Sequence, residues 1–448
     1  MKHRSKPKFE GNTIIDDIRC ALTSKPVVVL LSISAAIRVL FYFLLLPNSP
    51  SALGPDEGTY AQLAKYVSQG LPVEVYPVYG PDLYNSARSI ALPSAILIKL
   101  GFEELTAVRT VASVYGFTST LLLVLCFIAY LKLRNQTIQE LSSALDKKFI
   151  FLLGLFAFLP SNFVWSLIGL RESGSQFWLI ATFYLILKLL NSNERNSLKF
   201  TTLTAIALTL AYGTRPETAL VFSAVALFFS TAILLKCRKF MPLIAITIGI
   251  FAGQALVPTP ATPATPATPA TPATPATPAK NNLSKLSQNL ESILNYLEQK
   301  RNSNSLGAQS ALPISPCQSA SREIVNIVKC TLSQLPYRLF AFLFRPLIFF
   351  DQGSTTLTLA ALENLGWSIL IPLSIWISLR KRENCIDRFI NLSLTSYVLV
   401  FASTAALYEG NLGTAFRHKS TILWPLIFIL MLTPSILPKL RRRIPSAS

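Results

Sequence analysis

Residues 27–46 read VVVLLSISAAIRVLFYFLLL, and this apolar run decides the fold class. About 20 such residues suffice to cross the hydrocarbon core of a bilayer as one helix. The whole chain is 51% hydrophobic and only 14% charged, whereas soluble domains are about 25% charged. We therefore expect an all-α protein, a polytopic bundle of roughly 10–12 transmembrane helices. The expected spans are 27–46, 106–131, 149–166, 173–190, 200–213, 216–235, 239–256, 363–379, 389–407 and 420–437.

Basic residues set the expected orientation of these spans. The formal net charge is +19, but the Lys and Arg residues lie mainly in short segments between apolar runs. The positive-inside bias explains that distribution better than a nucleic-acid partner does. We expect the basic N-terminus 1–26 and the basic tail 439–448 in the cytoplasm, with no cleavable signal peptide. This orientation holds only if two shorter apolar runs, 89–101 and 337–350, do not each make a full crossing.

Between the two basic ends, the chain divides into three parts. These are a transmembrane core at 27–256, a long polar outer loop at 257–336 and a C-terminal group of transmembrane helices at 337–438. The loop contains seven copies of Thr-Pro-Ala, from Thr259 to Ala279. Proline at every third position forbids helix and sheet and favours an extended polyproline II linker. Cys317 and Cys330 lie close together in the loop and form a disulfide if it faces an oxidising compartment.

Two adjacent carboxylates stand out in the first expected outer loop, 47–88, within Pro55-Asp56-Glu57-Gly58-Thr59-Tyr60. A membrane protein has no structural need for them there, so acid chemistry at the membrane surface is the simplest explanation. A solvated pair of loop acids is the alternative. Carboxylates supply a general base, and Arg and Lys supply contacts to phosphate. The predicted outer face also gathers Glu74, Asp82, Arg88, Arg171, Glu172, Arg215, Glu217, Glu409, Arg417, His418 and Lys419.

Structural roles compete with functional ones for these charged residues. Arg171-Glu172 and Arg215-Glu217 are also explained as local ion pairs that stabilise hairpin turns. The run 417–419 is also explained as an interfacial anchor. Charged groups at membrane depth are costly and are functional candidates by default. Arg38, inside the first span, either pairs with a buried acid or snorkels to the interface. Arg109, at the start of the second long span, either caps a helix end or contacts a ligand.

The run from Pro55 to Ala64, closing with Gly70, resembles the first extracytoplasmic loop of the GT-C superfamily, membrane glycosyltransferases of the protein O-mannosyltransferase and lipid A aminoarabinose transferase type. That loop typically reads Asp-Glu, then Tyr, then a short juxtamembrane helix with Ala, then Gly. Further matches follow in the family's order: Ala91-Leu92-Pro93 up to Leu100-Gly101-Phe102, Ala107-Val108-Arg109, Leu159-Pro160 through Ser166 to Arg171-Glu172-Ser173, and Gly213-Thr214-Arg215-Pro216-Glu217. The resemblance covers roughly residues 27–240. It departs at Arg88 to Pro93, where many members have Pro-Pro-Leu.

The resemblance implies a polyprenyl-phosphate sugar donor, a glycan, lipid or protein acceptor, and inverting displacement on the outer face of a bacterial plasma membrane. It implies Asp56 as the general base and Glu57 as the residue that orients Asp56 or the acceptor. Some members use a divalent metal and others do not; Asp56 and Glu172 are the residues that could share an ion here, and the sequence requires none. The candidates to stabilise the leaving lipid phosphate are Arg88, Arg215, Arg417 and Lys419. The other candidate substrate-binding residues are Tyr60, Arg109, Arg171, Glu172, Glu217 and His418.

Two other functions are carried as alternatives. A polysaccharide polymerase or ligase acting on lipid-linked glycans would share the outer basic groups without needing Asp56, and the segment 409–418 also resembles loops of bacterial polysaccharide-synthesis membrane proteins. A non-enzymatic transporter or flippase is the second alternative. That class often shows internal repeats and broken helices near the bilayer midplane, whereas the charges here cluster near span ends.

Overall fold

The computed structural model of this chain describes residues 13–44, 55–72, 80–134, 145, 147–237, 239–256, 297, 301, 324–351, 355–380 and 385–433. The Thr-Pro-Ala tract and the basic tail, on which two of the sequence predictions fall, lie outside these residues. Throughout the described ranges the regular elements are helices and no strand occurs, which confirms the all-α prediction. The helices that precede the tract are α1 (Ile14–Thr23), α2 (Lys25–Leu44), α3 (Pro55–Ser68), α4 (Gly80–Lys99), α5 (Glu104–Leu133), α7 (Lys147–Phe158), α8 (Pro160–Leu167), α9 (Arg171–Leu190), α10 (Glu194–Tyr212), α11 (Pro216–Cys237) and α12 (Met241–Leu256). Those that follow it are α14 (Ile324–Phe344), α15 (Thr355–Leu379), α16 (Cys385–Tyr408), α17 (Leu412–Lys419), the 3-10 turn η2 (Ser420–Ile422) and α18 (Leu423–Met431).

Six of the described helices are long and apolar enough to cross a membrane. They are α2, α5, α9, α11, α15 and α16. α7 and α8 together make a seventh candidate, bent by 46° where Pro160 begins α8. Six apolar helices indicate a multi-pass membrane protein in a lipid bilayer.

The structure differs from the expected elements in three places. The apolar run 337–350 is divided: its first residues are the second half of α14, which begins at Ile324 and ends at Phe344, and the rest follow that helix. Most of the run 89–101 belongs to α4, which begins earlier, at Gly80, and ends at Lys99. The expected span 420–437 begins as a 3-10 turn and continues as the short α18, which ends at Met431. Apolar composition marked these regions correctly, but helix ends depend on the turns around them.

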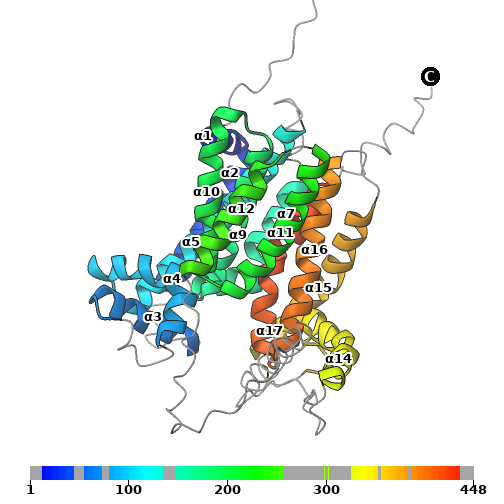
Figure 1. The fold of residues 1–448 in the computed structure, drawn as a ribbon. Coiled ribbons are helices and arrows are strands. Elements are labelled where there is room, and N and C mark those ends of the chain that lie inside the picture. Colours follow the sequence, from blue (N-terminus) through cyan, green and yellow to red (C-terminus); the bar gives the residue numbers. More distant parts are fainter. Residues whose placement is uncertain are drawn as a thin grey trace, which may run out of the picture. The chain divides into compact units, whose positions relative to one another are not determined.

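The chain forms two compact units. The first contains the described residues within 1–257, 369–398 and 420–448, and the second contains those within 258–368 and 399–419. In the first unit α5 is the central helix and packs against α9, α4, α8 and α3. Figure 1 shows α9 to α12 side by side in green, with α3 and α4 running across the ends of the long helices. A small-residue stripe at Gly249 and Gly253 lets α12 approach α10 closely.

Side-chain contacts place two groups of chain segments at opposite ends of α5. Near its C-terminus, Lys132 donates to Asp17 of α1 at 2.6 Å. Near its start, the Thr110 hydroxyl lies 3.0 Å from that of Tyr42, which is close to the end of α2. The end of α2 and the start of α5 are therefore neighbours, and α3 and α4 lie between them in the sequence. At 1.5 Å per residue, Arg109 and Lys132 are about 35 Å apart along α5.

Candidate functional site

The predicted acidic pair lies in the first turn of α3, not in an irregular loop. Pro55 begins the helix, and proline is favoured there because that position needs no N–H donor. Acidic side chains in a first helical turn also interact favourably with the helix dipole. The two neighbours occupy different environments: Asp56 is half-buried, whereas Glu57 is 0% exposed. Of the two, Asp56 is the one that is partly exposed.

Glu57 is held by Arg109 of α5 in a two-pronged ion pair. Arg109 Nε donates to Glu57 Oε1 at 2.6 Å, and Nη2 donates to Oε2 at 3.2 Å. Such forked guanidinium–carboxylate pairs are strong and geometrically specific. Gly169 completes the pocket for Glu57: its φ is +69°, and a Cβ there would lie 2.9 Å from Val108 and 3.3 Å from Glu57. Arg109 therefore has a third role, as the buried partner of an acid.

A second buried ion-pair cluster lies where α9 begins and α10 meets α11. Arg215 Nη1 donates to Glu172 Oε1 at 3.3 Å, and its Nε donates to Glu217 Oε1 at 3.3 Å. The local pair predicted between Arg215 and Glu217 is present. The local pair predicted between Arg171 and Glu172 is not formed, and Glu172 binds Arg215 from another helix. Both Arg215 and Glu172 are buried.

α4 ties these segments together. Arg171 Nη1 donates to the Ser86 carbonyl at 3.2 Å. The backbone N–H of Ser89 donates to the Gly213 carbonyl at 3.1 Å, and the Ser89 and Thr214 hydroxyls hydrogen bond. Arg88 packs over Gly213, where a Cβ would lie 2.8 Å from Arg88 Nε. The segments that carry the family resemblance thus lie at one end of the first unit, as the alternating topology requires.

The predicted site of the first unit contains as many carboxylates as guanidinium groups. The acids are Asp56, Glu57, Glu172 and Glu217, and the bases are Arg88, Arg109, Arg171 and Arg215. Arg109 and Arg215 are bound to carboxylates. Arg171 contacts a backbone carbonyl and has no carboxylate partner among the described residues. Its guanidinium therefore has charge available for an anionic ligand. No group of three or more His, Cys, Asp or Glu side chains suited to a metal occurs in the described ranges.

Tyr60, predicted to bind substrate, is a packing residue in the structure. It is almost fully buried in an apolar cluster with Leu63 and Ala64 of α3, Ile90 of α4 and Val108 of α5. This cluster fixes α3 against α4 and α5. Its effect is to hold the first turn of α3, with Asp56 and Glu57, in a defined position.

The remaining predicted residues lie on α17 of the second unit. His418 Nδ1 contacts Glu409, and the Thr414 hydroxyl donates to the other oxygen of Glu409 at 2.7 Å. Lys419 is buried and donates to the Leu343 carbonyl at 2.9 Å and to the side chain of Asn364. Burial lowers the pKa of Lys419 to about 7, and the nearby carboxylate of Glu363 opposes that shift. Arg417 is half-buried.

Cys330 of α14 is disulfide-bonded. Cys317, the partner that the sequence proposes, lies outside the described residues. A stable disulfide is typical of an oxidising compartment.

Sequence reasoning missed a buried ionic cluster at the other end of α5. Asp17 accepts from Lys132 at 2.6 Å, from Lys188 at 2.8 Å and from the Tyr184 hydroxyl at 2.6 Å. The segment 1–26 was predicted to be only a polar basic terminus, but its Thr13–Asp16 capping box starts helix α1. That box was a readable signal for the helix. The burial of Asp17 had no local signal, because its partners come from α5 and α9.

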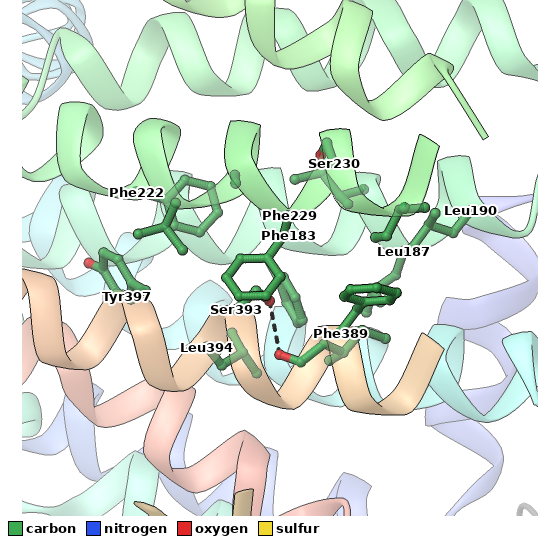
Figure 2. Close-up of a pocket in the computed structure, with 15 residues that line it drawn as sticks. Phe183, Leu187, Leu190, Phe222, Phe229, Ser230, Phe389, Ser393, Leu394 and Tyr397 are labelled. Atoms are coloured by element: carbon green, nitrogen blue, oxygen red, sulfur yellow. Dashed lines mark hydrogen bonds between the residues drawn. The ribbon is translucent and has the colours of Figure 1, made fainter. Parts of the chain in front are cut away.

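An apolar groove runs between α9, α11 and α16 in the first unit (Figure 2). Its cavity has a volume of about 50 Å³, and aromatic rings make up much of its wall, among them Phe183, Phe222, Phe229 and Phe389. Tyr397 stands at one end of the row of labelled side chains in Figure 2.

Comparisons with protein families, with curated proteins and with solved structures find no match to this chain.

Proposed function

We propose that this protein is a membrane glycosyltransferase that moves a sugar from a polyprenyl-phosphate donor to an acceptor hydroxyl. The observation that carries the proposal is the assembly around the first turn of α3, where Asp56 is reachable beside a fully buried Glu57–Arg109 pair. A fixed neighbour gives Asp56 a defined position at a helix end, and a general base must lie within hydrogen-bond reach of the proton it takes.

The reaction is a direct displacement with inversion. The acceptor oxygen bonds to the anomeric carbon, the bond from that carbon to the phosphate oxygen breaks, and the acceptor proton passes to Asp56. The leaving polyprenyl phosphate carries the negative charge. Cationic groups that are aimed at such developing charge stabilise the transition state.

The contacts change the order of the cationic candidates. Arg215 is already bound by two carboxylates, so its charge is compensated. Arg171 contacts a backbone carbonyl at the same end of the unit and has no carboxylate partner among the described residues. We assign the phosphate contact to Arg171.

The test uses the full-length protein reconstituted in bilayers and a panel of lipid-phosphate sugars, with release of polyprenyl phosphate as the readout. Wild type turns over at least one donor, and Asp56→Asn binds that donor without turnover. Glu104→Gln is the matched control, because this acid forms a surface pair with Lys65 near the same helices, and it retains wild-type turnover. Equal turnover by wild type and Asp56→Asn would refute the assigned base. A wild type that consumes no donor of the panel rejects the transferase proposal for these donors.

A polymerase or ligase acting on lipid-linked glycans is the second candidate, and one observation favours it. The Glu409–His418 pair is buried in the second unit and holds an imidazole by a carboxylate, the usual arrangement of an oriented general base. The same assay separates the two functions. Under the second function His418→Gln abolishes glycan transfer and Asp56→Asn does not.

A further inference from the structure

Arg38 is buried within the apolar helix α2 without a carboxylate partner. Its side chain is 4% exposed, and its Nη1 donates to the carbonyl and the hydroxyl of Ser34. The guanidinium carbon lies 5.0 Å from the centre of the Phe163 ring. In the described part of the chain, Nε and Nη2 have no hydrogen-bond partner. Both roles predicted for Arg38 are therefore wrong among the described residues. The guanidinium pairs with no acid, and it hydrogen bonds to Ser34, four residues earlier in α2, instead of extending toward the end of the helix.

This arrangement is costly unless something completes it. An isolated charge in an apolar environment loses its hydration, and each buried donor without an acceptor adds a further penalty. A cation–π contact and one serine compensate part of that cost. The buried charge calls for a negatively charged group close to the guanidinium.

A cavity of about 330 Å³ lies beside Arg38, within the usual size range of ligand pockets. Besides Arg38, it is lined by Ala35, Val39, Tyr42 and Phe43 of α2, by Phe102, and by Thr110, Ser113, Val114 and Phe117 of α5. Val39, Phe43 and Val114 are exposed on helices that are apolar enough to span a membrane. The cavity is therefore bordered by side chains that face lipid, and a ligand enters it sideways from the bilayer.

We propose that this cavity is a binding site for an anionic glycerophospholipid. Its phosphate accepts from the hydroxyl of Ser113 and compensates the charge of Arg38, which lines the same cavity, and an acyl chain lies along Val114 and Phe117. Charge complementarity selects this occupant: the anionic headgroup balances the guanidinium charge, and the acyl chain covers the apolar wall. A lipid without net charge carries its own cation beside the phosphate and compensates the Arg38 charge less fully.

The lipid site is separate from the proposed catalytic site and does not rest on it. Arg109, next to Thr110 in the sequence, points to α3 and is bound to Glu57. Thr110 faces α2 and contacts Tyr42. The two sites therefore lie on different faces of α5.

The experiment uses the purified full-length protein in detergent, titrated with phosphatidylglycerol or with phosphatidylcholine of the same acyl chains. Native mass spectrometry counts the bound lipid, and the thermal unfolding midpoint reports its effect on stability. We expect one tightly held phosphatidylglycerol that raises the midpoint, and no such effect of phosphatidylcholine. Arg38→Gln weakens phosphatidylglycerol binding by roughly tenfold or more. Lys25→Gln, which removes an exposed charge from the start of the same helix, retains wild-type binding.

Two results overturn the proposal. One is an equal response of wild type to the two lipids, and the other is undiminished phosphatidylglycerol binding by Arg38→Gln. If Arg38→Gln fails to fold, Ser113→Leu provides the second test, because it fills the cavity and leaves Arg38 in place. Retained phosphatidylglycerol binding by Ser113→Leu removes the cavity as the site. None of these readouts depends on sugar transfer, so failure here and failure of the transferase proposal are distinguishable.

Discussion

Replacing Glu57 by Gln should destabilise the protein because it leaves Arg109 as an uncompensated buried charge. The pair consists of two charge-assisted hydrogen bonds, of 2.6 and 3.2 Å, between side chains that are almost completely buried. Hydrogen bonds to charged groups contribute about 1.5–3 kcal/mol each, and removing one partner of a buried pair costs about 3–5 kcal/mol. We expect about 3 kcal/mol for Glu57→Gln, because glutamine keeps one acceptor oxygen.

A double-mutant cycle isolates the ion pair from the general effect of substitution. Glu57→Leu alone leaves a buried guanidinium, Arg109→Met alone leaves a buried carboxylate, and each should cost about as much as Glu57→Gln. Glu57→Leu combined with Arg109→Met removes both charges at similar volume beside the apolar cluster of α3, α4 and α5. Such replacements are often neutral, so the double variant should lie within about 1 kcal/mol of wild type. Unfolding of the detergent-solubilised protein by titration with denaturing detergent measures all three.

The neighbouring carboxylate is the matched control. Asp56→Asn removes the same charge one residue earlier, from a half-buried position, and should change stability by less than about 1 kcal/mol. It should abolish turnover under the proposed function, whereas the double variant at Glu57 and Arg109 should fold and retain measurable turnover. If Glu57→Gln unfolds at the wild-type midpoint, or if the double variant is as unstable as the single ones, the buried-pair argument is refuted.

Three further perturbations test other parts of the structure. Asp17→Asn leaves its two lysine partners as uncompensated buried charges and should cost about 3–5 kcal/mol. Asp16→Asn, in the capping box of the same helix, should cost about 1 kcal/mol, and equal detergent-titration midpoints of the two variants would refute the role of the Asp17 cluster. Gly169 and Gly70 both have a φ of +69°, but only at Gly169 would a Cβ lie 2.9 Å from a neighbouring side chain. Gly70→Ala should cost about 1–2 kcal/mol, and Gly169→Ala should cost clearly more and give a lower thermal midpoint. Burial lowers the pKa of Lys419 from 10.5 to about 7, so between these pH values the unfolded state binds more protons and the contribution of Lys419 to stability rises with pH. Between about pH 7 and 9, the thermal midpoint of wild type should therefore rise relative to that of Lys419→Met. Parallel pH profiles of the two proteins would contradict the shift.

Apolar composition predicted the all-helical fold and most helix positions, because in a membrane the backbone must satisfy its own hydrogen bonds. It also predicted that the outer loops of the first unit meet. The contact of Gly169 with Glu57 and that of Arg171 with Ser86 are examples of that meeting. Helix ends were less predictable: the region 420–437 reads as one apolar span, yet its first residues form a 3-10 turn and α18 ends at Met431.

The pairing of charges was not predictable from spacing. Arg171 and Glu172 are adjacent in the sequence, but neighbouring residues on a helix point in different directions and do not face each other. Glu172 instead meets Arg215, which the chain brings in from the turn before α11. Asp17 was missed for the same reason, because its partners are distant in the sequence. Arg38 was recognised as costly from the sequence alone, but only the structure shows that it has an open cavity beside it and no acid.

The placement of the buried ion pairs has a physical consequence for how the first unit is assembled. Between membrane helices, apolar contacts specify position weakly, because lipid tails are as apolar as the side chains they replace. A buried ion pair has a sharp distance dependence and is strongly unfavourable when broken. Asp17 joins α1 to the end of α5, and Arg109 joins the start of α5 to α3. We infer that these pairs fix the register of the bundle along α5 from both ends, about 35 Å apart. On this argument Asp17 positions Asp56 without touching it: displacing α5 along its axis moves Arg109, and with it Glu57 and the first turn of α3.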